Sequence, residues 1–517
     1  MFLKKGNDMK RLLKATLIVT LFSVLTRALG FVLRIILSRF LGAEMLGYYQ
    51  VSMSILGVLM TLVASGIPLV ISRNVAFKKA QGDIKSAYKS VSAGLIVSLF
   101  ISVGVSLVIY LFPEILNFIF KQNKSTTIVF YLLPSLIFSA VYCTLRSALW
   151  GEKHFFAISF TEFFEQVVRI ILCFILFYFP ILSSLSFGEK AGLSLSIACL
   201  FSALLVVFIY FGLKKKLNNP RGQIKSLIKS SMPITMLRTV SSLVQSIISV
   251  IIPLRLVHYG FSHSEAMAEF GTIMGMAFPL IMIPGTLISS LAVTIIPEIS
   301  SETDNIDKIK GVKDLSRLKS HINLSINMTV LISAILLPVF IVLGGPICKI
   351  LFKSELAGKY VSIASILMLP MGVSQITSSI LNSIGLEIKS LINYGVGAIA
   401  LFISIYFLPK YMGTNALIVG MGSLWTITMV LNLVMLKKRN LLEKTYLKTI
   451  GLVIFFGLVG ALACYLVYNL FIRFTTLLIS TCIAGVIGVG FMFGLYYVFN
   501  IAGFKGFLIT KKRKVVS

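Results

Sequence analysis

The stretch TLIVTLFSVLTRALGFVLRIILSR, residues 16–39, is apolar and long enough to cross a membrane, yet it contains two arginines. About 20 such residues span the hydrocarbon core of a bilayer as a helix. At 3.6 residues per turn, its small and polar side chains fall on one stripe of that helix: Thr16, Thr20, Ser23, Arg27, Gly30 and Arg34. A charge in mid-membrane costs about 2.5–3.5 kcal/mol on insertion scales, so we expect the stripe to face a helix bundle or an aqueous cavity.

The composition of the whole chain excludes an ordinary soluble domain. Of its 517 residues, 57% are hydrophobic and only 13% are charged, and the mean hydropathy is +0.96. Charged residues make up about 25% of a typical soluble domain. The net charge of +30 does not indicate nucleic-acid binding, because Lys and Arg stand in short clusters between apolar runs. The six cysteines form no CxxC pair, so we expect no disulfide framework, no metal site and no cofactor.

Apolar runs of spanning length recur along the chain, and they predict an all-α polytopic membrane protein with about fourteen transmembrane helices. The expected spans are residues 12–40, 46–71, 88–112, 126–147, 155–180, 190–213, 230–256, 268–297, 322–346, 358–383, 388–409, 414–436, 448–471 and 476–500. Connections after even-numbered spans are richer in basic residues, among them Arg146 and Lys153, and both termini share this property. We therefore expect a protein of the cell membrane with both termini in the cytoplasm.

The fourth and tenth expected spans resemble each other. LLPSLIFSAVYCTLRSALWGEK aligns with MLPMGVSQITSSILNSIGLEIK, so that Pro134 matches Pro370 and Ser147 matches Ser383. The two spans lie six apart, which is the register expected for two repeated halves of six helices. The sequence therefore predicts an N-lobe (1–213), a cytoplasmic linker (214–229), a pseudo-symmetric C-lobe (230–436), and two further helices with a basic cytoplasmic tail (437–517).

The seventh span would then correspond to the first, and it carries its own polar stripe with Arg238 and Gln245. An arginine stays charged when it is desolvated, and its planar fork of donors suits phosphate oxygens. A cavity with arginines and hydroxyl groups but few carboxylates favours a phosphorylated substrate over a cation. The expected substrate-binding residues are Ser23, Arg27, Arg34, Arg238 and Gln245. A structural interpretation stays open, in which each arginine pairs with a glutamate or reaches the membrane surface.

The fifth span carries Glu162, Glu165, Gln166 and Arg169 on one face. Glu165 and Arg169 lie four residues apart and can pair within the helix. One interpretation is a neutralised polar patch that packs helices, and the other is a proton or ion relay. The chain has no HExxH, P-loop or nucleophile-elbow motif, so we expect a transporter driven by a gradient or by the membrane potential and not an enzyme.

Other motifs concern helix packing. Gly271 and Gly275 form a GxxxG pattern, which predicts a close helix contact. Pro68, Pro284 and Pro297 are candidate bending points of spans.

Four stretches of the chain resemble one family of transporters. They are LTRALGFVLRIILSRFLGAEMLGYYQ (25–50), GIPLVISR (66–73), EQVVRI (165–170) and MAFPLIMIPGTLISSLAVTIIPEIS (276–300). Together they resemble the polysaccharide exporter and MurJ branch of the multidrug/oligosaccharidyl-lipid/polysaccharide flippase superfamily. The resemblance implies fourteen helices, two six-helix lobes around a cavity, and alternating access for an undecaprenyl-pyrophosphate-linked sugar. It also implies that Arg27 and Arg34 contact the substrate, that residues 448–500 form a groove for the lipid tail, and that enzymes of cell-wall or spore-cortex synthesis are partners.

The chain departs from the pattern of this family in two ways. Members of the MurJ type carry further cavity arginines in the second and eighth helices, and relatives often carry an acidic residue in the seventh. The corresponding spans of this chain have neither. Outward movement of two negative charges across an inside-negative membrane is downhill by about 2.3 kcal/mol per charge per 100 mV, so the potential alone can supply the direction.

Three classes of function remain for comparison. The leading hypothesis is a flippase for a lipid-linked glycan, such as a lipid II-like peptidoglycan or spore-cortex precursor or a polysaccharide unit. The alternative is a multidrug or organic-cation antiporter of the same superfamily, which requires carboxylates in the cavity. The third is a membrane glycosyl- or acyltransferase, which requires carboxylates and histidines that the spans do not provide.

Overall fold

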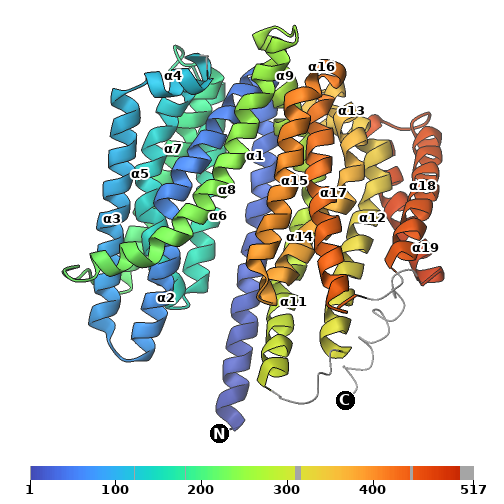
Figure 1. The fold of residues 1–517 in the computed structure, drawn as a ribbon. Coiled ribbons are helices and arrows are strands. Elements are labelled where there is room, and N and C mark those ends of the chain that lie inside the picture. Colours follow the sequence, from blue (N-terminus) through green and yellow to red (C-terminus); the bar gives the residue numbers. More distant parts are fainter. Residues whose placement is uncertain (1, 121–122, 181, 309–315, 443–445, 501–517) are drawn as a thin grey trace. The chain divides into compact units, whose positions relative to one another are not determined.

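The computed structural model describes residues 2–120, 123–180, 182–308, 316–442 and 446–500, and within these ranges the chain forms helices and no strands (Figure 1). It divides into two compact units. Unit 1 comprises Met1–Leu254 and Ser262–Gly271, and unit 2 comprises Arg255–Phe261 and Thr272–Ser517. The helix that contains the seventh expected span lies in unit 1 as far as Leu254. The lobe limits expected from the sequence stay a prediction.

Unit 1 is a bundle in which α5 packs against α2, α3 and α7. Its core contains the buried side chains of Ile71, Val91, Leu149 and Tyr210. The helices are α1 (Phe2–Ala64), α2 (Gly66–Ala80), α3 (Ile84–Leu111), α4 (Glu114–Phe120), α5 (Asn123–Gly151), α6 (Phe155–Tyr178), α7 (Phe187–Gly212), α8 (Ile224–His258) and α9 (His263–Gly271).

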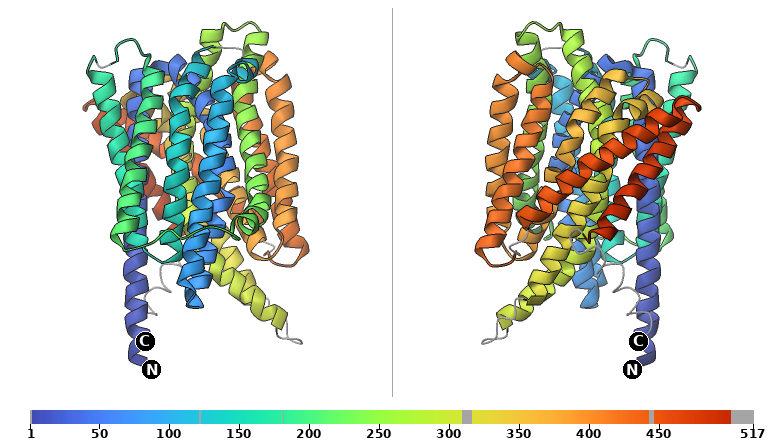
Figure 2. Two further views of the ribbon diagram at one scale, coloured as in Figure 1. Left: turned by 90° about the vertical axis from the view of Figure 1, so that its left-hand side faces the viewer. Right: turned by 90° about the vertical axis from the view of Figure 1, so that its right-hand side faces the viewer.

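Unit 2 is a second bundle, with a core that includes Ile322, Ile376, Ile380 and Leu436. Its helices are η1 (Thr272–Ala277), α10 (Phe278–Ile281), α11 (Ile283–Lys308), α12 (Ser316–Phe352), α13 (Glu355–Ala364), η2 (Ser365–Leu367), α14 (Met368–Ser383), α15 (Glu387–Phe407), α16 (Pro409–Met412), α17 (Asn415–Lys438), α18 (Tyr446–Phe471) and α19 (Leu477–Val498). The last two pack against each other and against α12, as the right-hand view of Figure 2 shows.

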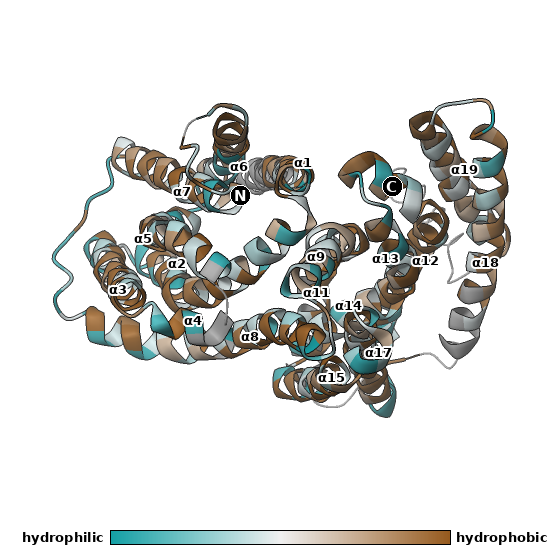
Figure 3. Ribbon diagram, turned by 90° about the horizontal axis from the view of Figure 1, so that it is seen from above, coloured by the Kyte–Doolittle hydropathy of each residue, from teal (hydrophilic) through white to brown (hydrophobic). Residues whose placement is uncertain are grey.

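The helices have the length and composition of a multi-pass membrane protein. Among the described residues, eleven helical segments are long and apolar enough to cross a membrane, or twelve if the bent pair His263–Ile281 and Ile283–Ala292 forms one span. Hydrophobic residues dominate the ribbons when the helices are viewed end-on (Figure 3). The exact number of fourteen stays a prediction. The first two expected spans fall in one segment, Ile18–Ala80 of α1 and α2, and count once. Helix α6, which has three charged residues, is not among the eleven.

The break between these two spans lies at Gly42. Helical geometry continues on both sides, but Gly42 has φ 69° and ψ 178°. This backbone conformation is accessible to glycine and strained for residues with a Cβ atom. The sequence places a glycine where the first span must turn into the second.

A close helix contact lies just after this break. A Cβ atom added to Gly271 of α9 would collide with the backbone of Ala43 and Gly47 in α1. The close contact predicted from the GxxxG pattern is therefore confirmed for its first glycine. Small residues are required here because the two backbones approach each other directly.

Ion pairs show which connections of unit 1 lie together. Glu152, after α5, pairs with Lys215 after α7, with Lys79 at the end of α2 (3.5 Å), and with His154 (3.3 Å). At the break in α1, Glu44 pairs instead with Lys124 at the start of α5, at 3.0 Å. The connections that follow the second, fourth and sixth expected spans therefore share one end of unit 1. The cytoplasmic orientation of that end stays a prediction.

The three prolines that are candidate bending points lie at different positions in their helices. Pro68 lies in the first turn of α2, directly after the helix break at Ser65, and Pro284 lies in the first turn of α11, after a bend of 45°. Pro297 lies inside α11. The eighth expected span is thus divided by the π-helix η1 and by this bend, and α11 continues as far as Lys308 into the polar connection.

The conformation of Gly42 predicts a loss of stability on substitution. Gly42→Ala should destabilise the protein by about 1–3 kcal/mol, because alanine is strained at this positive φ. Thermal unfolding of the purified protein in detergent measures the effect. Gly30→Ala is the matched control, because Gly30 lies within the helical part of α1 and a Cβ atom there meets nothing within 4 Å. Alanine has a higher helix propensity than glycine, by up to about 1 kcal/mol, so the substitution at Gly30 should not destabilise the protein. Equal melting temperatures for the two variants would therefore contradict the prediction.

Candidate functional site

Arg169 of α6 is directed toward α1. Its Nη2 donates a hydrogen bond to the hydroxyl group of Tyr49, at 2.6 Å, and Tyr49 is only 2% exposed. Within the described part of the chain, the Nε of Arg169 is buried and has no hydrogen-bond partner. Arg34 of α1 lies close enough for its charge to act on Arg169. Two guanidinium groups that repel each other at a partly buried site favour an anion between them.

Arg146 connects α5 to the same face of α6. Its Nη2 lies 2.6 Å from Oε2 of Glu162, and its guanidinium group lies 5.7 Å from the centre of the Tyr142 ring. The charge pattern of the sequence assigns Arg146 to a connection, but the structure places it inside α5. Its Nε is buried without a hydrogen-bond partner in the described ranges. Arg146 therefore keeps a free donor although one side of its guanidinium group is neutralised.

Glu165 of α6 pairs with neither of these two arginines. Both Arg169 and Arg146 act electrostatically on its carboxylate, but no hydrogen bond or ion pair joins the carboxylate to any described residue. The pair expected within α6 is not formed, because Arg169 bonds to Tyr49 instead. We call Arg34, Arg146, Glu162, Glu165 and Arg169 the arginine cluster. It brings together four residues that the sequence singles out, and Arg146 joins them.

A cationic pocket of about 300 Å³ opens beside the cluster. Arg146 and Arg238 both line it, together with Ala64, Ser65, Pro68, Leu69, Ser72, Cys143, Ser147 and Trp150. Nη1 of Arg238 donates a hydrogen bond to the carbonyl oxygen of Ser65 at 3.4 Å. Ser65 separates α1 from α2, where helical hydrogen bonding is interrupted and a carbonyl is available. The helix break thus holds Arg238 at the pocket.

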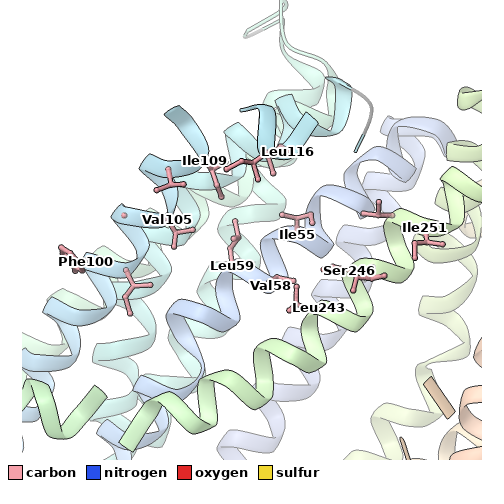
Figure 4. A pocket seen from close by; sticks show the side chains of 16 residues that line it. Ile55, Val58, Leu59, Phe100, Val105, Ile109, Leu116, Leu243, Ser246 and Ile251 are labelled. Atoms are coloured by element: carbon pink, nitrogen blue, oxygen red, sulfur yellow. The ribbon is translucent and has the colours of Figure 1, made fainter. Parts of the chain in front are cut away.

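An apolar pocket of about 710 Å³ lies between α1, α3, α4 and α8 (Figure 4). Of its 16 lining residues, Ser246 alone has a polar side chain, and its hydroxyl group donates to the carbonyl oxygen of Ser54 at 2.5 Å. Phe100 is 79% exposed at this pocket, and Val108 and Ile115 are also exposed. An apolar cavity without free polar groups excludes water and accepts hydrocarbon.

The two pockets lie on different flanks of the contact between α1 and α8. Small residues form that contact: Thr61 bonds to Thr239 at 3.4 Å, and Gly57 lies opposite Ser242. At 3.6 residues per turn, Arg238 is about 140° around α8 from Leu243, which lines the apolar pocket. The same pair of helices therefore presents a cation on one flank and hydrocarbon on the other.

The remaining candidates lie outside this arrangement. Ser23 and Arg27 are exposed on α1, where Phe22 packs against Phe156 and Phe163 of α6 with ring centres 5.7 and 5.6 Å apart. Gln245 is exposed on α8 and lines neither pocket. Their role in binding stays a prediction.

Sequence reasoning missed Tyr49 and Arg146 as members of the site. Arg146 precedes Glu162 by a short connection between successive spans, and this opposite-charge pair was the available signal. Tyr49 gives no such signal, because its partner Arg169 is 120 residues away.

Comparison with characterised proteins gives distant relatives over much of the chain. Stage V sporulation protein B of Bacillus subtilis (strain 168) is 23% identical over 402 residues, which cover 75% of this chain and 76% of the relative. Lipid II flippase MurJ of the same organism is 25% identical over 222 residues, or 40% of each chain.

Solved structures share the fold at low sequence identity. An inward-facing multidrug resistance MATE family transporter of the MOP superfamily has a TM-score of 0.66 and 15% identity, over 80% of this chain and 94% of that one. Lipid II flippase MurJ in an inward closed conformation has a TM-score of 0.65 and 15% identity, over 94% of this chain and all of that one.

MurJ is named as a flippase and the MATE protein as a transporter, in agreement with the expectation of a transporter and not an enzyme. The family described as polysaccharide biosynthesis protein matches residues 12–303, more than half of the chain. The chain therefore belongs to the polysaccharide biosynthesis protein family, and it shares its fold with the solved MATE transporter and MurJ.

Proposed function

We propose that this protein moves an undecaprenyl-pyrophosphate-linked glycan from the inner to the outer leaflet of the cell membrane by alternating access, with both termini in the cytoplasm. One observation carries the proposal: a cationic pocket and an apolar pocket are built on the same two helices, α1 and α8. A ligand that suits both must combine an anionic group with a hydrocarbon chain. The family membership supports this assignment, because a named relative is a lipid II flippase.

The anionic group is the better defined half of the ligand. The arginine cluster has three arginines and two glutamates, and Glu162 is already paired with Arg146. Arg238 adds a further positive charge at the cationic pocket. Guanidinium groups hold phosphate oxygens through two parallel hydrogen bonds. The excess of positive charge supports a pyrophosphate group over the organic cation that the antiporter hypothesis requires.

The hydrocarbon half fits the apolar pocket. A volume of about 710 Å³ holds roughly twenty groups of the size of a water molecule, at about 30 Å³ each. This is room for one segment of a long lipid chain. The glycan itself is not specified by either pocket, so a peptidoglycan precursor, a cortex precursor and a polysaccharide unit remain candidates.

Arg27 provides the first test of substrate binding. Arg27→Ala should abolish translocation of a lipid-linked glycan in proteoliposomes, whereas Arg27→Lys should restore it only in part, since lysine lacks the planar fork. Arg221→Ala is the matched control, because Arg221 lies in the connection between α7 and α8, outside both pockets. Normal translocation by Arg27→Ala, with the protein properly inserted, would remove Arg27 from the substrate-binding residues.

Gly104 provides the second test, at the apolar pocket. It lines this pocket, and an added Cβ atom meets no atom within 4 Å. Gly104→Leu should therefore fill the pocket without disturbing the fold. Displacement of about two methylene groups of bound lipid, at about 0.8 kcal/mol each, predicts a loss of affinity of roughly tenfold.

The measurement for Gly104→Leu is equilibrium binding of a long-chain and a short-chain polyprenyl diphosphate sugar. The control is Gly395→Leu in α15, where a Cβ atom also meets open space. Only the long-chain ligand should lose affinity, and only in Gly104→Leu. Equal binding of both ligands by both variants contradicts a role for the apolar pocket.

The choice of glycan needs a direct comparison. Translocation by the purified protein should be measured with lipid II and with undecaprenyl-pyrophosphate carrying a polysaccharide repeat unit. A cation-stimulated efflux of an organic dye, without movement of either lipid, would instead favour the antiporter.

A further inference from the structure

The unpaired carboxylate of Glu165 is the unusual feature of the arginine cluster. Glu162 has an arginine at 2.6 Å, and Arg169 has a tyrosine hydroxyl at the same distance. Glu165 has neither, although Arg169 and Arg146 both act on its charge. Each of these arginines also keeps an Nε that is buried without a partner among the described residues. The carboxylate of Glu165 is thus near two arginines that have free donors, but it forms no hydrogen bond with them.

The net charge of the arginine cluster changes when Glu165 binds one proton. With both glutamates ionised, three arginines leave a net charge of one positive unit. If Glu165 takes a proton from water, the net charge rises to two positive units. A diphosphate that links a lipid to a sugar carries two negative charges. The cluster by itself compensates one of them when Glu165 is ionised and both when Glu165 is protonated. Compensation within a partly buried site is favourable, so protonation of Glu165 strengthens binding of the anion in addition to the positive charge that Arg238 supplies at the neighbouring pocket.

We propose that Glu165 is a proton-binding counter-ion that compensates the arginines in the empty protein and is protonated when the anionic group of the substrate binds. This inference rests on the proposed function, because it assigns the pyrophosphate to the arginine cluster. Binding of the anion and binding of the proton then favour each other, and thermodynamic linkage requires the effect to be mutual. Glu165 would therefore couple transport to protons.

The groups around Glu165 support this role over simple helix packing. Helix α6 contributes Glu162 and Arg169, and Arg169 in turn interacts with Arg34 and Tyr49 of α1. Helix α5 contributes Arg146, Tyr142 and Cys143, and α7 contributes Cys199. Among these groups the arginines stay charged under all relevant conditions. A carboxylate retained only to hold two helices together would be expected to form the close ion pair that Glu162 forms with Arg146.

The test compares ligand affinity at several pH values. Binding of a short-chain polyprenyl diphosphate sugar is measured between pH 5.5 and 8, because this diester has no proton to exchange in that range. In the unmodified protein the affinity should rise as the pH falls, by at most about tenfold per pH unit for one linked proton. Glu165→Gln, which imitates the protonated form, should bind tightly and without dependence on pH.

Glu162→Gln is the matched control. It removes a carboxylate from the same face of α6, three residues away, but it leaves Glu165 in place. Its affinity should still depend on pH. A second measurement needs no variant: calorimetry in buffers of different ionisation enthalpy should detect proton uptake, approaching one proton per ligand, when the unmodified protein binds the diester.

The outcomes separate this inference from the proposed function. If the unmodified protein binds the diester but takes up no proton, or if Glu165→Gln keeps the pH dependence, Glu165 is not the counter-ion while the flippase assignment stands. If no diester binds at any pH, the proposed function itself fails. If Glu165→Gln does not fold, the proton uptake of the unmodified protein decides the question.

Discussion

The cost of placing a guanidinium group among apolar helices governs the arrangement of unit 1. Each arginine within a span needs a compensating group, because a charge in a membrane interior is expensive. The structure meets this requirement in three ways. Arg146 takes a carboxylate, Arg169 takes a buried tyrosine hydroxyl, and Arg238 takes a carbonyl oxygen released by a helix break. None of these partners saturates its guanidinium group, which has five donors. An anionic ligand can accept hydrogen bonds from the remaining donors.

The features that could be predicted from the sequence are those set by local pattern. Hydropathy located the spanning helices, and the 3.6-residue period placed Glu162, Glu165 and Arg169 on one face of α6. The alternation of basic residues agrees with the ion pairs that gather Lys79, Glu152 and Lys215 at one end of unit 1. These properties depend on neighbours in the sequence or on the bilayer as a solvent, so a single chain reveals them.

The features that escaped prediction depend on tertiary contacts. The pairing of Arg169 with Tyr49 joins residues 120 positions apart, and no local pattern encodes it. The local charge pattern predicted that Arg146 lies in a connection, but it lies inside α5 and pairs with Glu162 of α6. The π-helix η1 interrupts a span that is uniformly apolar in sequence, where periodicity carries no signal of a change in hydrogen bonding. Helical geometry also resumes directly after Gly42, so the first two expected spans are not separated by a loop.

The ion-pair centre at Glu152 has a mechanical consequence. One carboxylate, only 6% exposed, joins the connections after α2, α5 and α7. If one of these connections moves away, its cation loses its partner, while the others stay bound and hold Glu152 in place. The connections of three pairs of successive helices are therefore held together at one end of unit 1. At the opposite end, Glu44 and Lys124 form an ion pair that is more exposed. Exposed pairs are weak, so the centre at Glu152 is the stronger of these two electrostatic links.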